Sequence, residues 1–246
     1  MSYQPFQMYH NQAYHSALEE KVGYAAFSVQ SEAHVYHAGS FELRSRPQSY
    51  QPLFFMDVKP EYAFMPEAFL RHDRPSQPFV GDALAVERDV KKAFWVTTGK
   101  KFPSDIRLAV LDNHSFNKQV VHPVVVGFSL NRKELGMVSD VVVRAGAKDH
   151  LMLTIGHEIG HVLSKTLPNK HHEEAKAFAF SRAWMTAIRD KNIAGLRGCI
   201  ILDNPAQNGL HDVSSAFVWR TMAQGHHALE LYWDIVAGRV VMPLVI

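Results

Sequence analysis

Residues 151–163, LMLTIGHEIGHVL, combine an apolar, helix-forming run with two histidines four positions apart. On an α-helix this spacing places His157 and His161 on one face, a turn apart, where both imidazoles can hold one metal ion. Glu158 is rotated by about 100° from His157, so its carboxylate can reach the same cleft without being a ligand. The stretch therefore predicts a metal-binding helix that also carries a general base.

A third ligand is expected from the start of the next helix, which the sequence predicts over about residues 171–189. Folded as an antiparallel hairpin, the two helices bring His161 and Glu174 to one level. An apolar stripe follows Glu174 at helical spacing, whereas Lys176, a poor neighbour for an inward face, follows Glu173. Glu174 is therefore the predicted ligand. The alternatives to Glu174 are Glu173 and His171. The full set of candidates is the four polar residues at the start of this helix: His171, His172, Glu173 and Glu174.

Two histidines and one carboxylate form a catalytic rather than a structural zinc set, because the fourth coordination position stays open for water. Zinc lowers the pKa of that water toward about 7. Glu158 would take its proton and pass it to the leaving amine, while the ion stabilises the oxyanion. Since H-E-x-x-H is typical of zinc metallopeptidases, we expect one Zn²⁺ per chain and hydrolysis of a peptide or protein substrate.

The residues after the motif distinguish between types of zinc peptidase. A metzincin has glycine and histidine where this chain has Ser164 and Leu167. Residues 174–179, EAKAFA, instead resemble the glutamate-alanine-x-x-phenylalanine-alanine signature of gluzincin-type peptidases. Over about residues 85–190 the chain is most similar to the minimal archaeal gluzincins and the ImmA/IrrE-like peptidases.

This resemblance implies an α+β, zincin-like fold, with a small twisted mixed sheet over the active-site helix and a helical C-terminal part. The edge strand of that sheet would line the substrate cleft, and residues 123–129, PVVVGFS, are the best candidate for it. An ordinary buried strand is the alternative interpretation of these residues. The resemblance implies a role for each residue that matches the family's motif. His157, His161 and Glu174 would bind zinc, and Glu158 would act as the general base.

Apolar periodicity predicts the other elements of the chain. Proline at position 123 favours an edge position for the second predicted strand. The predicted helices cover about residues 82–98, 149–165, 171–189, 211–222 and 226–237, and the predicted strands cover 106–110, 120–130 and 137–143.

Residues 1–80 differ in composition from the rest of the chain. They hold seven of the eight tyrosines and seven of the twelve prolines, whereas all four tryptophans follow them. We therefore expect an aromatic, proline-rich N-terminal extension over 1–80 and a metallopeptidase domain over 81–246. The extension could be a pro-segment that covers the cleft, a partner-binding segment, or part of one larger domain.

Charge and cysteine content narrow the function classes. The 26 basic and 24 acidic residues give a net charge of +2 without a dense basic run, so nucleic acid is not an expected partner. A single cysteine fits a reducing compartment. No secretory signal and no apolar run near the roughly 20 residues of a membrane span are present, so we expect a soluble, cytoplasmic protein.

Three hypotheses about function remain open at this stage. The chain is an active zinc peptidase, a zincin-fold regulatory or binding module, or a structural protein whose histidines bind no metal. The last is possible because a chain with 15 histidines contains the motif by chance in roughly a few per cent of cases. Candidates for stabilising the oxyanion lie in the C-terminal helices, and sequence does not choose among them: His211, His226, His227 and Tyr232.

Overall fold

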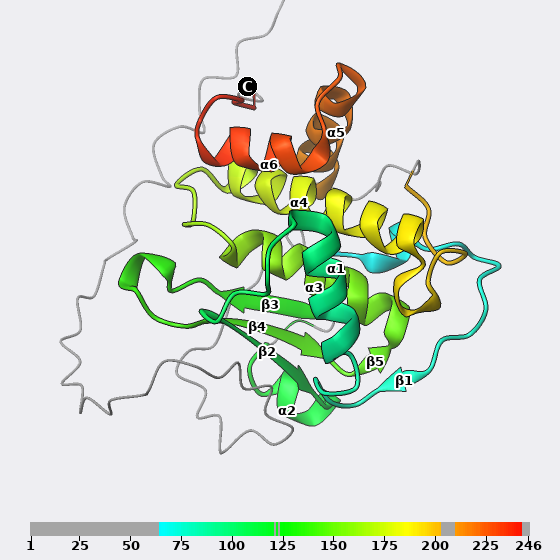
Figure 1. Ribbon diagram of the computed structural model, residues 1–246. Coiled ribbons are helices and arrows are strands. Elements are labelled where there is room, and N and C mark those ends of the chain that lie inside the picture. The colour runs from blue at the N-terminus through cyan, green and yellow to red at the C-terminus, as the bar shows by residue number, and fades with distance from the viewer. Residues whose placement is uncertain (1–63, 121, 123, 203–209, 243–246) are drawn as a thin grey trace, which may run out of the picture. The chain divides into compact units, whose positions relative to one another are not determined.

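The structure is a computed structural model that describes residues 64–120, 122, 124–202 and 210–242. Within these ranges the fold is α+β, with small sheets and layered helices (Figure 1). The strands are β1 (Phe79–Val80), β2 (Ile106–Leu111), β3 (Gly127–Leu130), β4 (Ser139–Arg144) and β5 (Gly146–Ala147). The α-helices are α1 (Glu87–Thr98), α2 (Asn113–Asn117), α3 (Lys148–Val162), α4 (Lys170–Lys191), α5 (Leu210–Ala223) and α6 (Ala228–Val236). Short 3₁₀ turns are η2 (Pro66–Phe69), η3 (Lys133–Leu135) and η4 (Ile193–Gly195).

β4 is the central strand of a three-stranded mixed sheet with the order β2-β4-β3. β2 runs parallel to β4, and β3 runs antiparallel to it with Ser129 opposite Val141. Both faces of the central strand are covered, so its buried residues form an almost continuous run instead of alternating. Val141 and Val143 belong to the main core, whereas Val142 packs into a second, smaller core that includes Phe116.

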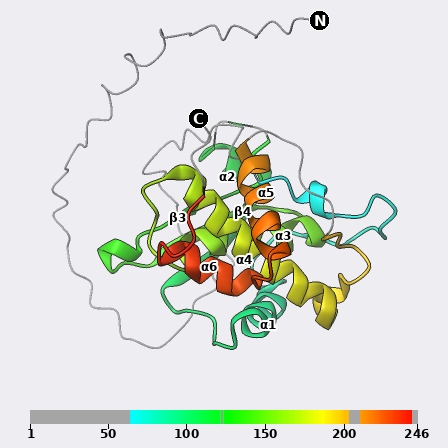
Figure 2. The ribbon, with the colours of Figure 1, turned by 90° about the horizontal axis from the view of Figure 1, so that it is seen from above.

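Four helices, α3 to α6, lie in successive layers on one face of this sheet. α3 packs against β3 and β4, α4 packs on α3, and α5 and α6 pack on α4 (Figures 1 and 2). The motif helix α3 is therefore enclosed between the sheet and α4. α1 also packs on α4. None of the helices in the described ranges has the length and apolar character of a membrane-spanning helix.

Two glycines of α3 allow α3 and α4 to approach closely. A Cβ atom on Gly156 would lie 2.3 Å from the Trp184 side chain, and one on Gly160 would lie 2.8 Å from the Cα of Ala177. Trp184 fills the space beside Gly156, and its Nε1 donates a hydrogen bond of 2.8 Å to the carbonyl oxygen of Met152. A side chain at Gly160 would therefore push the two helices apart, and one at Gly156 would displace the Trp184 ring.

The first turns of two helices differ from the sequence predictions. α1 begins at Glu87 and not at residue 82, because Asp82 accepts a hydrogen bond of 3.1 Å from the Ala85 amide in a turn that precedes the helix. Asp149, the predicted N-cap of the motif helix, lies inside the first turn of α3 instead. There its carboxylate accepts a hydrogen bond of 2.7 Å from Arg74.

The strand predicted over residues 120–130 is present as the shorter β3. The residues before it turn, with the Val125 amide donating to the His122 carbonyl at 3.2 Å. Pro123 lies outside the described residues. The sequence did not predict the ladder of β1 and β5, because strands of two residues are too short to show a period.

Residues 64–80, part of the expected N-terminal extension, contribute to the main core. Four side chains of this segment are at most 4% exposed and belong to it: Phe64, Phe69, Leu70 and Val80. Arg74 binds Glu67 at 2.8 Å and Asp149 at 2.7 Å, which ties the segment to the start of α3. The rest of the expected extension, residues 1–63, lies outside the described residues.

The substitution Gly160→Ala should lower the free energy of unfolding by about 1–3 kcal/mol, because the new Cβ would meet the backbone of α4 at Ala177. This loss should exceed the gain from alanine as a better helix former, which is about 1 kcal/mol. Gly198→Ala is the matched control, since a Cβ there meets nothing within 4 Å. Chemical denaturation measures both variants, and equal stability of the two would contradict the close approach.

Candidate metal centre

Three side chains with metal-ligating atoms converge between α3 and α4. The Nε2 atoms of His157 and His161 lie 3.3 Å apart. Glu174 Oε2 lies 3.6 Å from His157 Nε2, and Glu174 Oε1 lies 3.9 Å from His161 Nε2. One ligand atom from each residue lies within 4.8 Å of the others, and no other such group of three occurs in the part of the chain that the structure describes. The structure thus brings together the three side chains that the sequence predicted as ligands.

The spacing of these atoms fits a small tetrahedral ion. Two ligand atoms that each lie about 2.1 Å from one such ion are about 3.4 Å apart, close to the separations in this cluster. The side chain of His157 is 2% exposed, and those of His161 and Glu174 are 15% and 13% exposed. Two nitrogens and one carboxylate in a shielded site are donors that zinc prefers, and they leave a coordination position open.

Glu173, the alternative ligand in the sequence, contacts the ring nitrogen of His161 opposite to the one that faces Glu174. Its Oε1 is 2.8 Å from His161 Nδ1, and its Oε2 accepts hydrogen bonds from the Leu167 amide at 2.7 Å and Lys176 Nζ at 2.9 Å. Because Glu173 engages Nδ1, the Nε2 atom of His161 is the one that faces Glu174 and His157. A carboxylate behind a histidine in this way fixes the orientation of the imidazole ring.

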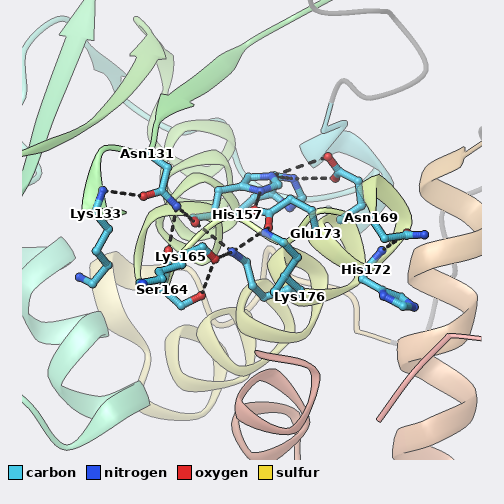
Figure 3. Close-up of polar contacts among 12 residues, drawn as sticks. Asn131, Lys133, His157, Ser164, Lys165, Asn169, His172, Glu173 and Lys176 are labelled. Atoms are coloured by element: carbon cyan, nitrogen blue, oxygen red, sulfur yellow. Dashed lines mark hydrogen bonds and ion pairs between the residues drawn. The ribbon is translucent and has the colours of Figure 1, made fainter. Parts of the chain in front are cut away.

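The sequence argument that placed Lys176 away from an inward face is wrong. Lys176 is fully buried, at 0% exposure. Its ammonium donates to the carbonyl oxygens of His161 at 3.1 Å and Lys165 at 3.0 Å, besides its ion pair with Glu173 (Figure 3). Because each of its three donors meets an oxygen, the charge is accommodated in the interior.

The other two polar residues at the start of α4 contact the C-terminal part of the chain. The Nε2 atom of His172 accepts a hydrogen bond of 3.0 Å from the Met242 amide. The carbonyl oxygen of His171 accepts one of 3.1 Å from Ser214 Oγ. Glu174 is therefore the member of this group that the structure places beside the histidine pair.

Aromatic rings enclose His157. The Phe64 ring stacks on the imidazole with centroids 4.4 Å apart and planes at 12°. The Phe178 ring meets it edge-on at 5.0 Å. These contacts fix the plane of the imidazole and keep it buried, so Phe64, which precedes η2, and Phe178 of α4 both shape this side of the cluster.

Glu158 is buried between α3 and β3, at 5% exposure. A Cβ on Gly127 would lie 3.3 Å from its Cγ, so a residue without a side chain lets the strand pass close to it. Burial is the main cause that raises the pKa of Glu158 to about 7, and Glu174 adds to it. His161 and a hydrogen bond with Ser129 act in the opposite direction. A pKa near neutrality suits a group that takes up and releases a proton.

His161 is surrounded by carboxylates. Burial, the largest single influence, lowers its pKa, but Glu174, Glu173 and Glu158 together raise the pKa to about 9. In the metal-free protein the His161 imidazole is therefore protonated at neutral pH. An ion that binds to Nε2 must displace this proton, so metal binding depends on pH.

Asn131 directly follows β3 and binds the end of the motif helix (Figure 3). Its Nδ2 donates to the carbonyl oxygens of His161 at 2.8 Å and Ser164 at 2.7 Å. α3 ends at Val162, earlier than the predicted residue 165, and the last carbonyls of a helix have no partner within it. Asn131 supplies those partners and thereby couples the outer strand to the cluster.

The proposed oxyanion residues of the C-terminal helices have other contacts in the structure. Tyr232 is fully buried, its ring packs against Phe180 at 5.6 Å, and burial raises its pKa. His226 Nδ1 lies 3.7 Å from Asp234, and His227 is the N-cap of α6. The side chain of His211 lies outside the described residues.

Replacement of Glu158 should make stability less dependent on pH. Its pKa of about 7 in the fold exceeds the ordinary 4.5, so its stabilising contribution is full below pH 4.5 and is lost as the pH rises through 7. The difference in free energy of unfolding between metal-free Glu158→Gln and the wild type should therefore shift by about 2–3 kcal/mol in favour of the variant between pH 4.5 and pH 8. Exposed Glu134 provides the control Glu134→Gln, and denaturation across this pH range is the measurement. A constant offset for Glu158→Gln would contradict the shifted pKa.

Comparisons of this chain with protein-family models, with curated proteins and with solved structures find no match. The geometry of the cluster and the chemistry of its donors therefore carry the functional argument. The resemblance to gluzincin-type peptidases stays a prediction from the motif residues.

Proposed function

We propose that the protein is a zinc-dependent peptide hydrolase that binds one ion through His157, His161 and Glu174. The observation that carries the proposal is that two imidazole nitrogens, 3.3 Å apart, and a carboxylate from another helix meet beside buried Glu158. Zinc in such a site would supply an activated water and a Lewis acid for the scissile carbonyl. A metal-binding site without a catalytic function would not require a buried carboxylate next to the ligands.

Glu158 serves as the general base in this proposal. Burial raises its pKa to about 7 in the metal-free protein. A positive ion beside it would favour the carboxylate form, which can accept a proton from the attacking water. Ser129 forms a hydrogen bond with the carboxylate and holds it on the β3 side of the cluster. After accepting the proton, Glu158 can deliver it to the leaving amine.

The outer strand β3 is the proposed docking edge for the substrate. Within the described residues β3 pairs with β4 on one side only, so the other side can pair with an extended peptide. Ser129 of β3 contacts Glu158, and Asn131 binds the end of α3, so a peptide on this edge would pass beside the cluster. This arrangement supports a peptide or protein as the substrate class.

An ion-pair network without a metal is the competing explanation of the same geometry. With a pKa of about 9, protonated His161 is stabilised by Glu173 and Glu174 without any ion. The two explanations differ in their affinity for zinc, because a network that only stabilises the fold gains nothing from metal. Metal content therefore separates them directly.

Elemental analysis of the purified full chain should find about one zinc per chain, lost in His157→Ala/His161→Ala. Glu158→Gln should keep the metal and lose at least 100-fold of the peptide hydrolysis rate, since general-base catalysis contributes about 10²–10⁴-fold. His114 is an exposed histidine of α2 outside the cluster, so His114→Ala is the matched control and should keep both metal and activity. Absence of zinc from the reconstituted wild type would rule out the proposed function.

A further inference from the structure

Lys176 has a polar environment that ties it to one ligand of the cluster. It is the fully buried lysine of α4, and its ammonium lies 2.9 Å from Glu173 Oε2. The same Glu173 carboxylate places its other oxygen 2.8 Å from His161 Nδ1. Lysine, carboxylate and imidazole thus form one continuous chain of contacts that ends at a proposed ligand (Figure 3).

The contacts of Glu173 show why a cation is needed behind it. Oε2 is held by the Leu167 amide at 2.7 Å and by Lys176, and these two contacts fix the carboxylate independently of the imidazole. Oε1 is then presented to Nδ1 in one position. Since the ring is held at Nδ1, its Nε2 is directed toward His157 and Glu174. A mobile carboxylate could not impose that orientation.

The charges around the site also favour a role for Lys176 beyond packing in the core. Three carboxylates, those of Glu158, Glu173 and Glu174, act on His161 electrostatically. Lys176 provides a positive charge in direct contact with one of them. A buried lysine carries a large desolvation penalty, and apolar residues of similar volume often stabilise a fold as well or better. Stability alone therefore gives little reason for a lysine at this position.

We infer that Lys176 is a positioning residue for the proposed zinc site, acting through Glu173 to hold the imidazole of His161 in its metal-binding orientation. The inference rests on the proposed function, since it concerns affinity for the same ion. A purely structural role is the alternative, because the ammonium also donates to the carbonyl oxygens of His161 and Lys165. Asn131 already donates to the first of these carbonyls.

Zinc affinity of the full chain, measured by competition with a chelator, tests the inference. Lys176→Met and Glu173→Gln should each weaken zinc binding about 10- to 100-fold, the usual loss when a group behind a metal ligand is removed. Because the lysine acts through the carboxylate, the double variant should bind zinc about as weakly as Glu173→Gln alone. The absorption bands of the Co²⁺-substituted protein should change in both single variants, since the orientation of a ligand changes.

Ile188→Val is the control for a merely structural effect. Ile188 lies on α4 with 0% exposure in the main core, so the variant opens a small cavity on the same helix and leaves the contacts of Glu173 unchanged. It should lower the melting temperature and keep the zinc affinity and the Co²⁺ spectrum of the wild type.

Two results would overturn the inference. One is zinc affinity within twofold of wild type in Lys176→Met, and the other is an additive loss in the double variant. If Lys176→Met does not fold, Glu173→Gln decides alone, since unchanged affinity there removes the route through which the lysine acts. A wild type that binds no zinc would instead contradict the proposed function. Failure of the inference and failure of the proposed function are therefore distinguishable.

Discussion

The close contact of α3 and α4 at Gly156 and Gly160 is the constraint on which the site depends. A glutamate side chain is short, so Glu174 can reach two imidazoles on α3 only if the helix axes lie close together. The missing Cβ atoms at the two glycines provide that proximity, and Trp184 fills the remaining space. The two central x positions of the motif, occupied by Ile159 and Gly160, therefore serve the core while the histidines serve the cluster.

Enclosure of α3 on several sides determines the electrostatics of the cluster. The sheet covers one side of the helix, α4 covers another, and the Phe64 ring covers His157. Water is largely excluded, and this burial itself raises the pKa of Glu158. The neighbouring carboxylates raise the pKa of His161 against the effect of burial, because charges act strongly on one another in such an environment. The same burial that strengthens these interactions requires each charge to have a partner, which is why the network extends to Lys176.

Much of the site follows from local sequence patterns. The spacing of His157 and His161 is a property of one helix, and the reach of Glu174 follows from a hairpin of two predicted helices. The α+β class and the strand at β2 were also predicted correctly. Helical periodicity was sufficient for the ligand set because His157, His161 and Glu174 lie on two consecutive helices.

The residues that sequence reasoning missed act through tertiary contacts. Asn131 and Gly127 reach α3 from a strand distant in sequence, and no pattern along the chain marks that contact. Lys176 was misjudged because a lysine reads as a surface residue until its three acceptors are known. Helical periodicity places a side chain relative to its own helix axis. It gives no information on the carbonyl oxygens of His161 and Lys165, which come from the preceding segment of the chain.

The stack of Phe64 on His157 has a consequence for where the chain can be cut. A fragment that starts at residue 81, the boundary suggested by composition, would lack this ring and the buried Phe69 and Leu70. It would also lack Arg74, leaving the buried carboxylate of Asp149 without its cation. Such a fragment would expose an apolar patch and an imidazole face to solvent. The smallest unit for recombinant production and crystallisation therefore includes residue 64 and the segment that follows it.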